Sequence, residues 1–223
     1  MFDVVAAIEA RALNPADADL LRSSWQEAWT ALNADPPAGL RERLIACYSE
    51  PHRRYHTVQH LGECLQHVQP ALALAEHPGE VAVALWFHDA IYALRRQDNE
   101  LKSARFAHQE LLAAGVSVPS AERVYALVMA TRHSALPETQ DERLLVDVDL
   151  SILGAEPRRF DEYEAQVGEE YAWVPRWWFR RKRLEVLREF LARAPIYGSA
   201  YFRDRLEPQA RLNLQRSIMQ LTR

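Results

Sequence analysis

Residues 81–89 read Val81-Ala82-Val83-Ala84-Leu85-Trp86-Phe87-His88-Asp89, an apolar run that ends in an imidazole and a carboxylate. A stretch that is apolar on every side is typical of a helix buried at the centre of a fold, and it predicts a buried helix over 80–92. The two ionisable groups at its end are costly to bury without a partner. A metal ion would satisfy both, because imidazole nitrogen and carboxylate oxygen together bind divalent metals.

Composition indicates an all-α protein. The chain has 223 residues, of which 48% are hydrophobic, enough to bury a sizeable core, and only seven are glycine. Alanine, leucine, arginine and glutamate are the commonest residues, and these are good helix formers. No Gly/Ser-rich linker interrupts the chain, so we expect a single helical domain over 1–223.

Local signals divide the chain into a series of helices. Asp35-Pro36-Pro37 and Leu136-Pro137 interrupt the helical pattern, and Gly115 is a typical residue at a helix C-terminus. Trp25 and Trp29 are four residues apart and therefore share one helix face. The pattern predicts helices over 4–12, 17–33, 38–49, 57–75, 80–92, 98–114, 120–133, 141–153, 157–171, 176–193 and 199–221.

Charge and cysteine content are those of a cytoplasmic protein with no nucleic-acid or membrane partner. The formal net charge is −4, which gives no general attraction to nucleic acid or to an anionic membrane. Cys47 and Cys64 form no metal-binding or redox motif, and we expect both to be reduced, mostly buried thiols. The first residues lack the basic region of a signal peptide, and no apolar segment approaches the ~20 residues of a membrane span.

Histidines and aspartates on both sides of the apolar run form a candidate site. His56 and His60 are four residues apart, a spacing that suits a metal site but also occurs at a solvated helix start. Asp149 belongs to the apolar stripe of its predicted helix, where a carboxylate needs a cation, a metal or several hydrogen-bond donors. Asp147 lies on a different side of that helix, and we expect it to face solvent or to cap the helix.

The order His60, then His88-Asp89, then Asp149, each on a separate predicted helix, resembles the HD superfamily of metal-dependent phosphohydrolases. The resemblance covers about residues 50–153 and implies a helical bundle of the HD-domain and phosphodiesterase type. The stretch Tyr55-His56-Thr57-Val58-Gln59-His60 is similar to one in cyclic-nucleotide phosphodiesterases, as is Asp149-Leu150-Ser151. Small bacterial proteins known as predicted HD-superfamily phosphohydrolases are similar at Arg54-Tyr55-His56-Thr57, Phe87-His88-Asp89, Asn99-Glu100, Thr131-Arg132-His133 and Asp147-Val148-Asp149-Leu150.

The resemblance implies a role for each of these residues. His60, His88, Asp89 and Asp149 would hold one divalent metal ion (Zn, Mn, Fe, Ni, Co or Mg), and some members of the superfamily bind a second ion. His56 would be the general acid that protonates the leaving oxygen, and Asp89 would orient the attacking water as well as bind the metal. His56 also fits the first-ligand position of many HD proteins, so an exchange of roles between His56 and His60 stays open; we favour His60 as the ligand.

Basic residues near this pattern are candidates for binding a substrate. Arg53 and Arg54 either clamp a phosphate through bidentate bonds or are ordinary surface arginines of a loop. His133 either contacts the substrate or a second ion, or is a surface histidine at a helix end. The segment Arg176–Arg183 could stack on a base and bind its phosphate, but we favour rings packed into the core beneath a solvated basic face.

These expectations predict a metal-dependent phosphoric ester hydrolase. We expect its substrate to be a small phosphorylated metabolite, with nucleotides among the candidates, attacked by a metal-activated water. Two alternatives stay open. A di-iron oxygenase on a related helical core would need further histidine ligands, for which His133 is the one good candidate. A non-catalytic regulatory or scaffold protein would keep a purely structural metal site.

Overall fold

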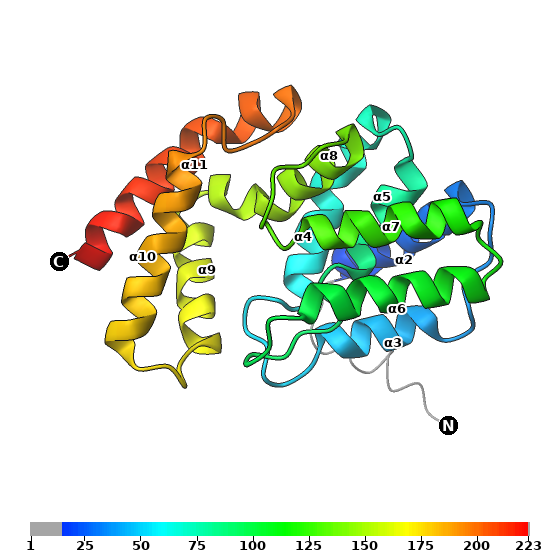
Figure 1. Ribbon diagram of the computed structural model, residues 1–223, viewed down its shortest axis with the longest axis horizontal. Coiled ribbons are helices and arrows are strands. Elements are labelled where there is room, and N and C mark those ends of the chain that lie inside the picture. The colour runs from blue at the N-terminus through cyan, green and yellow to red at the C-terminus, as the bar shows by residue number, and fades with distance from the viewer. Residues whose placement is uncertain (1–14, 223) are drawn as a thin grey trace.

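Helices alone form the regular structure of the described part of the chain, residues 15–222 (Figure 1). The helices of this computed structural model are α2 (Pro15–Ala31), α3 (Leu40–Tyr48), α4 (Val58–Val68), η1 (Gln69–Leu74), α5 (Pro78–Phe87), α6 (Asn99–Ala113), α7 (Val118–Ala130), α8 (Gln140–Asp149), η2 (Leu150–Gly154), α9 (Pro157–Glu170), α10 (Arg176–Ala192) and α11 (Ala200–Thr222), where η marks a 3-10 helix. The expected all-α, single-domain bundle is confirmed. The helix predicted over 4–12 lies outside the described residues. None of the helices within 15–222 combines the length and the apolar character needed to cross a bilayer.

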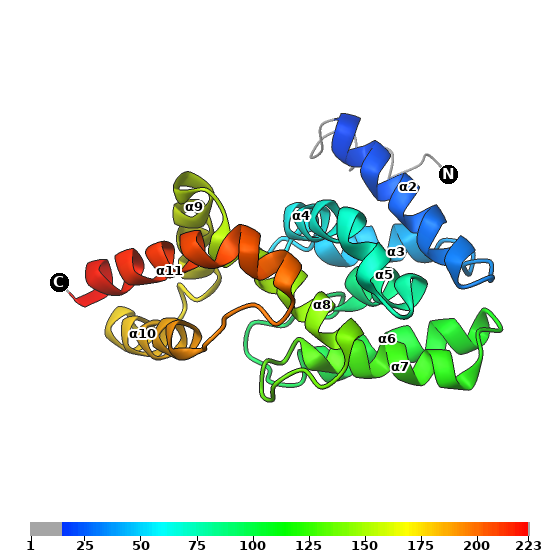
Figure 2. The same ribbon diagram turned by 90° about the horizontal axis from the view of Figure 1, so that it is seen from above.

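Helix α5 lies at the centre of the first group of helices, as its apolar sequence predicts. All of its residues from Gly79 to Phe87 are buried. Figure 2 shows α2 on one side of α5 and the pair α6 and α7 on the other, and α5 contacts α2 and α7 directly. A Cβ atom at Gly79 would lie 2.9 Å from the Cβ of Ala31, so glycine at this position permits the close approach of α2.

The end of α5 differs from the prediction. The helix expected over 80–92 ends at Phe87, and His88 and Asp89 lie in the turn that follows. Side chains from remote segments hold this turn: the Arg53 guanidinium donates to the carbonyl oxygens of Asp89 and Ala90, at 2.7 and 2.9 Å. These bonds connect segments that are more than 30 residues apart in the sequence. The local sequence pattern around Phe87 therefore does not reveal that the helix ends there.

Helices α9, α10 and α11 form a second group beside this core (Figure 1). Polar side chains of the segment 207–213 hold α11 against its neighbours. Glu207 accepts from backbone N–H groups in the loop before α11, and Arg211 donates to carbonyl oxygens at the end of α10. Asn213 donates to two carbonyl oxygens at the end of η2. The segment is therefore structural.

Asp147 is buried, contrary to the expectation that it faces solvent or caps its own helix. Its two carboxylate oxygens accept hydrogen bonds from the backbone N–H groups of Gly198 and Ser199, each at 2.7 Å. These groups lie immediately before α11, where backbone donors lack partners within the helix. Asp147 therefore caps a distant helix and links the end of α8 to the start of α11.

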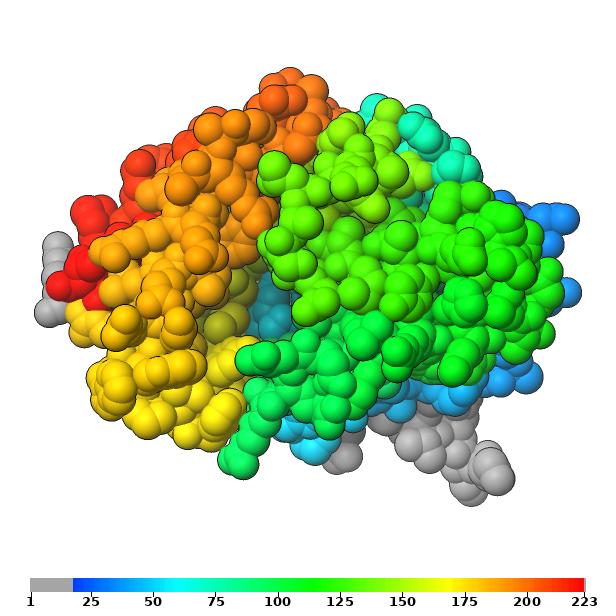
Figure 3. Space-filling model, viewed as in Figure 1, coloured from blue at the N-terminus to red at the C-terminus, as the bar shows by residue number. Residues whose placement is uncertain are grey.

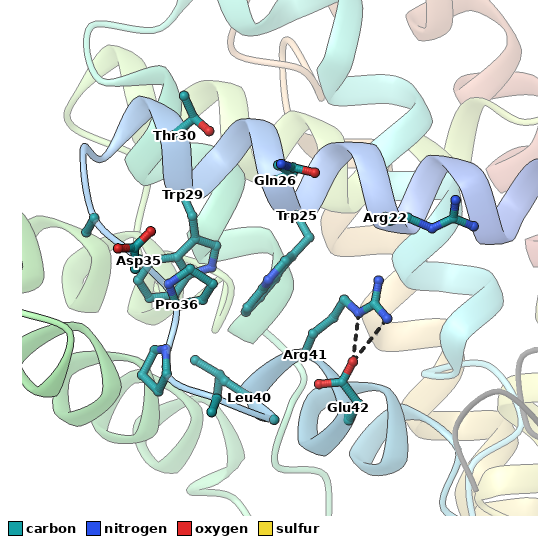
Figure 4. Close-up of a pocket in the computed structure, with 14 residues that line it drawn as sticks. Arg22, Trp25, Gln26, Trp29, Thr30, Asp35, Pro36, Leu40, Arg41 and Glu42 are labelled. Carbon is teal, nitrogen blue, oxygen red and sulfur yellow. Dashed lines mark hydrogen bonds and ion pairs between the residues drawn. The ribbon is translucent and has the colours of Figure 1, made fainter. Parts of the chain in front are cut away.

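A pocket between α2 and α3 shows how the N-terminal part of the described chain packs (Figure 4). Trp25 and Trp29 point from the same face of α2 toward α3, as their spacing predicts, and both are buried. Pro36 lies in the loop that connects the two helices and lines the same pocket. The two rings are in contact with each other, with centroids 5.4 Å apart, and join α2 to the core.

Candidate metal centre

Four of the residues selected from the sequence meet in one cluster. His60 comes from α4, His88 and Asp89 from the turn after α5, and Asp149 is the last residue of α8. The Nε2 atoms of His60 and His88 are 3.1 Å apart. Asp89 Oδ2 lies 3.1 Å from Nε2 of His88 and 3.5 Å from Nε2 of His60. Asp149 Oδ1 lies 3.3 Å from Nε2 of His60 and 3.7 Å from Nε2 of His88. These separations suit ligands that share one ion at bond lengths of about 2.0–2.2 Å.

Hydrogen bonds orient the ring of His88. Its Nδ1 lies 2.7 Å from the carbonyl oxygen of Leu85. Because a carbonyl oxygen only accepts, Nδ1 carries a proton. Once Nε2 has lost its own proton, as metal binding requires, its lone pair faces the cluster. Histidines that bind metals commonly make this bond with their other nitrogen. The hydroxyl of Tyr48 accepts the backbone N–H of Asp89 at 3.2 Å, which helps to fix the neighbouring carboxylate.

Charge at the cluster favours a bound cation. Burial alone would lower the pKa of His88, but Asp89 and Asp149 outweigh this effect and raise it to about 9. Burial alone would raise the pKa of both aspartates, but the neighbouring histidines hold those pKa values below their usual range. Two ionised carboxylates therefore face two imidazole nitrogens in a largely buried site, and a divalent cation would satisfy all four groups.

Cys64 belongs to the same cluster, which the sequence analysis missed. Its Sγ lies 3.7 Å from Nδ1 of His60. Donor atoms of His60, Cys64, His88 and Asp149 all lie within 4.8 Å of one another, so this group can hold a metal ion. Burial raises the pKa of the Cys64 thiol well above its ordinary value. The spacing of four residues from His60 was the available signal, because it places both side chains on one face of α4.

His56 lies beside the cluster. The centroid of its ring is 5.9 Å from that of His60, and its Nδ1 lies 2.8 Å from Oε2 of Glu170. Burial alone would lower the pKa of His56, but the negative charges of Asp89 and Glu170 outweigh this effect and raise it. The geometry therefore favours His60 over His56 as the metal ligand and leaves His56 free to hold a proton.

Glu170, the last residue of α9, holds the loop before α4 in place. Its side chain is fully buried. Oε1 accepts the backbone N–H groups of Arg54, Tyr55 and His56, and Oε2 accepts from the hydroxyl of Tyr92. Glu170 lies outside the region 50–153 that resembles the HD superfamily, and no sequence pattern pointed to it. Its contact with His56 depends on the packing of α9 against that loop.

His133 reaches the cluster through Asp149. Its Nε2 lies 3.0 Å from Oδ2 of Asp149. The backbone of His133 has φ of 53°, a left-handed conformation that is uncommon outside glycine and that turns the chain after α7. Its Nδ1 is buried and has no hydrogen-bond partner among the described residues. Within residues 15–222, His133 is the only further histidine in contact with a carboxylate of the cluster.

Arg53 and Arg54 do not lie where a phosphate clamp was expected. Arg53 is buried, and its guanidinium donates to Glu50 and to the carbonyl oxygens of residues 56, 89 and 90. Arg54 is half exposed and pairs with Glu169 at 3.5 Å. Neither arginine lines the cavity beside the cluster. Arg53 instead joins the loop before α4 to the turn that carries His88 and Asp89.

A cavity of about 520 Å³ opens from one side of the cluster. Asp89, Asp149, His56 and His133 line it on that side, and α9 and α10 form the opposite wall. Figure 3 shows this face of the molecule hollowed between α10 and the helices α6 and α7. The rings of His60 and His88 are fully buried behind the two carboxylates. The volume lies in the range of about 300–1,000 Å³ that is usual for small-molecule sites.

The structure corrects the favoured interpretation of Arg176–Arg183 in part. Phe179 packs against the core as expected, whereas Trp177 and Trp178 are 69% and 44% exposed and do not. Arg183, by contrast, is largely buried and forms an ion pair with Glu164, so the basic face is only partly solvated. The segment contributes four residues to the cavity, which are Trp178, Phe179, Lys182 and Arg183.

Comparisons of the chain with protein-family models, with curated proteins and with solved structures found no match. The resemblance to the HD superfamily therefore stays a prediction carried by the residues quoted above. The structure contributes an independent observation: the described residues contain a buried group of imidazole, thiol and carboxylate side chains that can hold a metal ion.

Proposed function

We propose that this protein is a metal-dependent hydrolase of phosphate esters. The observation that carries the proposal is the convergence of His60, His88, Asp89 and Asp149 at one wall of a cavity of small-molecule size. Catalytic metal sites keep an open position, whereas structural sites are closed by protein ligands. The carboxylates of Asp89 and Asp149 reach the cavity, so an ion held here is accessible to a ligand. This access favours an enzyme over a structural metal site.

A divalent ion held by these residues would neutralise charge on a phosphoryl group and lower the pKa of an adjacent water toward ~7. Asp89 and Asp149 border the part of the cavity nearest the cluster, and a phosphoryl group bound there lies between them and the opposite wall. The low pKa of Asp89 keeps its carboxylate ionised at neutral pH. Asp89 can therefore accept a hydrogen bond from the attacking water and orient it.

His56 is the proton donor in this proposal. Its Nδ1 is bonded to Glu170, so Nε2 is the ring nitrogen available to a ligand in the cavity, which His56 lines. The raised pKa of His56 favours the protonated ring near neutral pH, and that ring can protonate the leaving oxygen. Tyr92 stacks on the imidazole with ring centroids 4.2 Å apart and limits its rotation.

Metal content and turnover together test this proposal. The purified protein would be analysed for bound metal and assayed on p-nitrophenyl phosphate and a panel of small phosphate esters with Mg, Mn, Fe, Co, Ni and Zn. We expect bound metal and turnover that a chelator abolishes. Asp149→Asn should lose both, whereas His108→Ala, on α6 and outside the cluster, should keep both. Circular dichroism would verify that each variant is folded. A wild-type protein with no bound metal and no turnover with any ion would refute the proposal.

A further inference from the structure

The cavity is larger than a phosphoryl group requires. At about 520 Å³ it has room for a drug-sized molecule. The wall opposite the cluster is largely apolar and includes Val167 on α9 with Trp178, Phe179, Val186 and Phe190 on α10. A substrate with its phosphoryl group at the cluster would place its remaining atoms against this wall.

Exposed apolar side chains mark the wall as a binding surface. Trp178 is 44% exposed and Val186 is 38% exposed, although both are large and apolar. Both face the cavity, eight residues apart on α10 and therefore on one face of that helix. Apolar residues gathered in a concave surface are typical of ligand sites, because the ligand removes them from water.

Among the residues that the structure describes, one lysine or arginine side chain that lines the cavity has no carboxylate partner. Those with carboxylate partners are Arg96 with Asp98, Lys182 with Glu185 and Arg183 with Glu164. Arg132 also lines the cavity, and no residue of the described chain pairs with its guanidinium. Arg132 is the neighbour of His133, which contacts the cluster through Asp149. Arg132 therefore lines the same cavity as the candidate metal ligands Asp89 and Asp149.

We propose that the cavity selects phosphate esters of an aromatic, largely apolar alcohol. Arg132 binds the phosphoryl oxygens, and the α10 wall around Trp178 packs against the aromatic ring. The proposal rests on the proposed function for the position of the phosphoryl group at the cluster. A guanidinium matches two phosphate oxygens with parallel hydrogen bonds, so Arg132 takes the role first expected of Arg53 and Arg54. A ring packed on Trp178 and Val186 removes apolar surface from water on both sides of the contact.

Two non-hydrolysable probes separate the contributions of the anion and the ring. Phenylphosphonate and methylphosphonate carry the same anionic group, and only phenylphosphonate has a ring for the wall. Calorimetric titration into the metal-loaded protein should show about tenfold tighter binding of phenylphosphonate. Trp178→Ala should remove most of that preference. Trp177→Ala is the matched control, because Trp177 precedes Trp178 on α10, is more exposed and does not line the cavity.

The Arg132 assignment is tested with the same titrations. Arg132→Ala should weaken both phosphonates about equally, on the order of tenfold, because the anion is common to them. Arg132→Lys keeps the charge but loses the paired hydrogen bonds, and it should recover part of the affinity. Arg105→Ala, an exposed arginine on α6 that does not line this cavity, should leave both affinities unchanged.

Each outcome decides one point. Equal affinities for the two phosphonates, or a preference that survives Trp178→Ala, would overturn the assignment of the wall. Unchanged binding by Arg132→Ala would overturn the assignment of Arg132. Turnover assays distinguish this proposal from the proposed function. A phenylphosphonate preference without turnover of any phosphate ester refutes hydrolase activity and leaves the binding site standing, whereas turnover without the preference refutes the binding site alone.

Discussion

The contact between Glu170 and His56 gives the sharpest test of the proposed chemistry. Glu170→Gln preserves the size of the side chain and removes its charge. Oε1 of Glu170 accepts three backbone N–H groups at 2.8–3.2 Å, and Oε2 accepts from Nδ1 of His56 at 2.8 Å and from the hydroxyl of Tyr92 at 2.9 Å. The amide oxygen of a glutamine can serve one of these two sets. Its NH₂ group cannot accept from the other, so at least one donor loses its partner.

The size of the effect on stability follows from the pKa of Glu170. Burial alone would raise that pKa, but the bonds from His56 and from the backbone outweigh it and lower the pKa from 4.5 to about 2. At about 1.4 kcal/mol per pKa unit, the folded environment stabilises the ionised carboxylate by roughly 3 kcal/mol. Because the folded-state pKa is the lower one, this contribution is complete above pH ~4.5 and is lost as the pH falls toward 2. Urea unfolding at pH 7 should therefore show Glu170→Gln less stable by about 2–3 kcal/mol, with a smaller difference below pH ~4.

The effect on activity is a shift of the pH profile. Without the carboxylate the pKa of His56 falls, so His56 loses its proton at a lower pH. We expect the alkaline limb of the kcat/KM profile to move to lower pH and kcat/KM to fall about ten- to hundredfold. Glu169→Gln is the control, since Glu169 is exposed and pairs with Arg54 at the surface. An alkaline limb that stays in place while stability falls would show that Glu170 only holds the loop, and would refute His56 as the general acid.

Further predictions concern the scaffold around the site. Arg53→Lys keeps the charge but cannot supply all the donors that hold the turn after α5. Thermal unfolding should show a loss of about 2–4 kcal/mol in stability, and metal titration should show weaker binding. Arg54→Lys, the control, should change neither. Gly154→Ala would place a Cβ atom 2.6 Å from a Cβ of α11 and should cost on the order of 1–3 kcal/mol in denaturant unfolding. Gly62→Ala, in α4 with open space around the new Cβ, should instead stabilise by about 0.5–1 kcal/mol. Asp147→Ala removes the acceptors at the start of α11 and should lower the stability of the fold by about 1–2 kcal/mol. The first amides of α11 should also exchange hydrogen faster. Unchanged exchange of these amides would contradict the capping role.

The sequence predicted the helices well and their ends less well. Apolar periodicity and the scarcity of glycine identify helices because burial and propensity act locally along the chain. The ends of α5 and α8 depend on partners that are distant in sequence. Arg53 holds the turn after Phe87, and α11 packs against the residues that follow Asp149. Prediction extended both helices because nothing in their own sequence ends them.

The sequence predicted the part of the candidate site whose chemistry follows from residue type alone. Imidazole and carboxylate groups in apolar surroundings indicated a metal, and His60, His88, Asp89 and Asp149 do meet. Arg53 was expected to bind phosphate because its charge is visible in the sequence, whereas the carbonyl oxygens that already occupy its donors are not. Arg132 is the opposite case: the sequence did not mark it as a candidate for binding phosphate, but the structure does. Its availability depends on the absence of a partner among the described residues, which only the three-dimensional arrangement reveals.

The two groups of helices are coupled at the candidate site through the last turn of α8. Asp147 caps the start of α11, and Asp149, two residues later, belongs to the group of side chains that can hold a metal ion. Since both lie on the same helical turn, the packing of α11 constrains the backbone that presents Asp149. Glu170 provides a second connection, because α9 delivers it to the loop that carries His56. The second group therefore contributes the apolar wall of the cavity and also positions a candidate metal ligand and the proposed proton donor. If the proposed function holds, substitutions at the base of α11 should change metal affinity as well as stability.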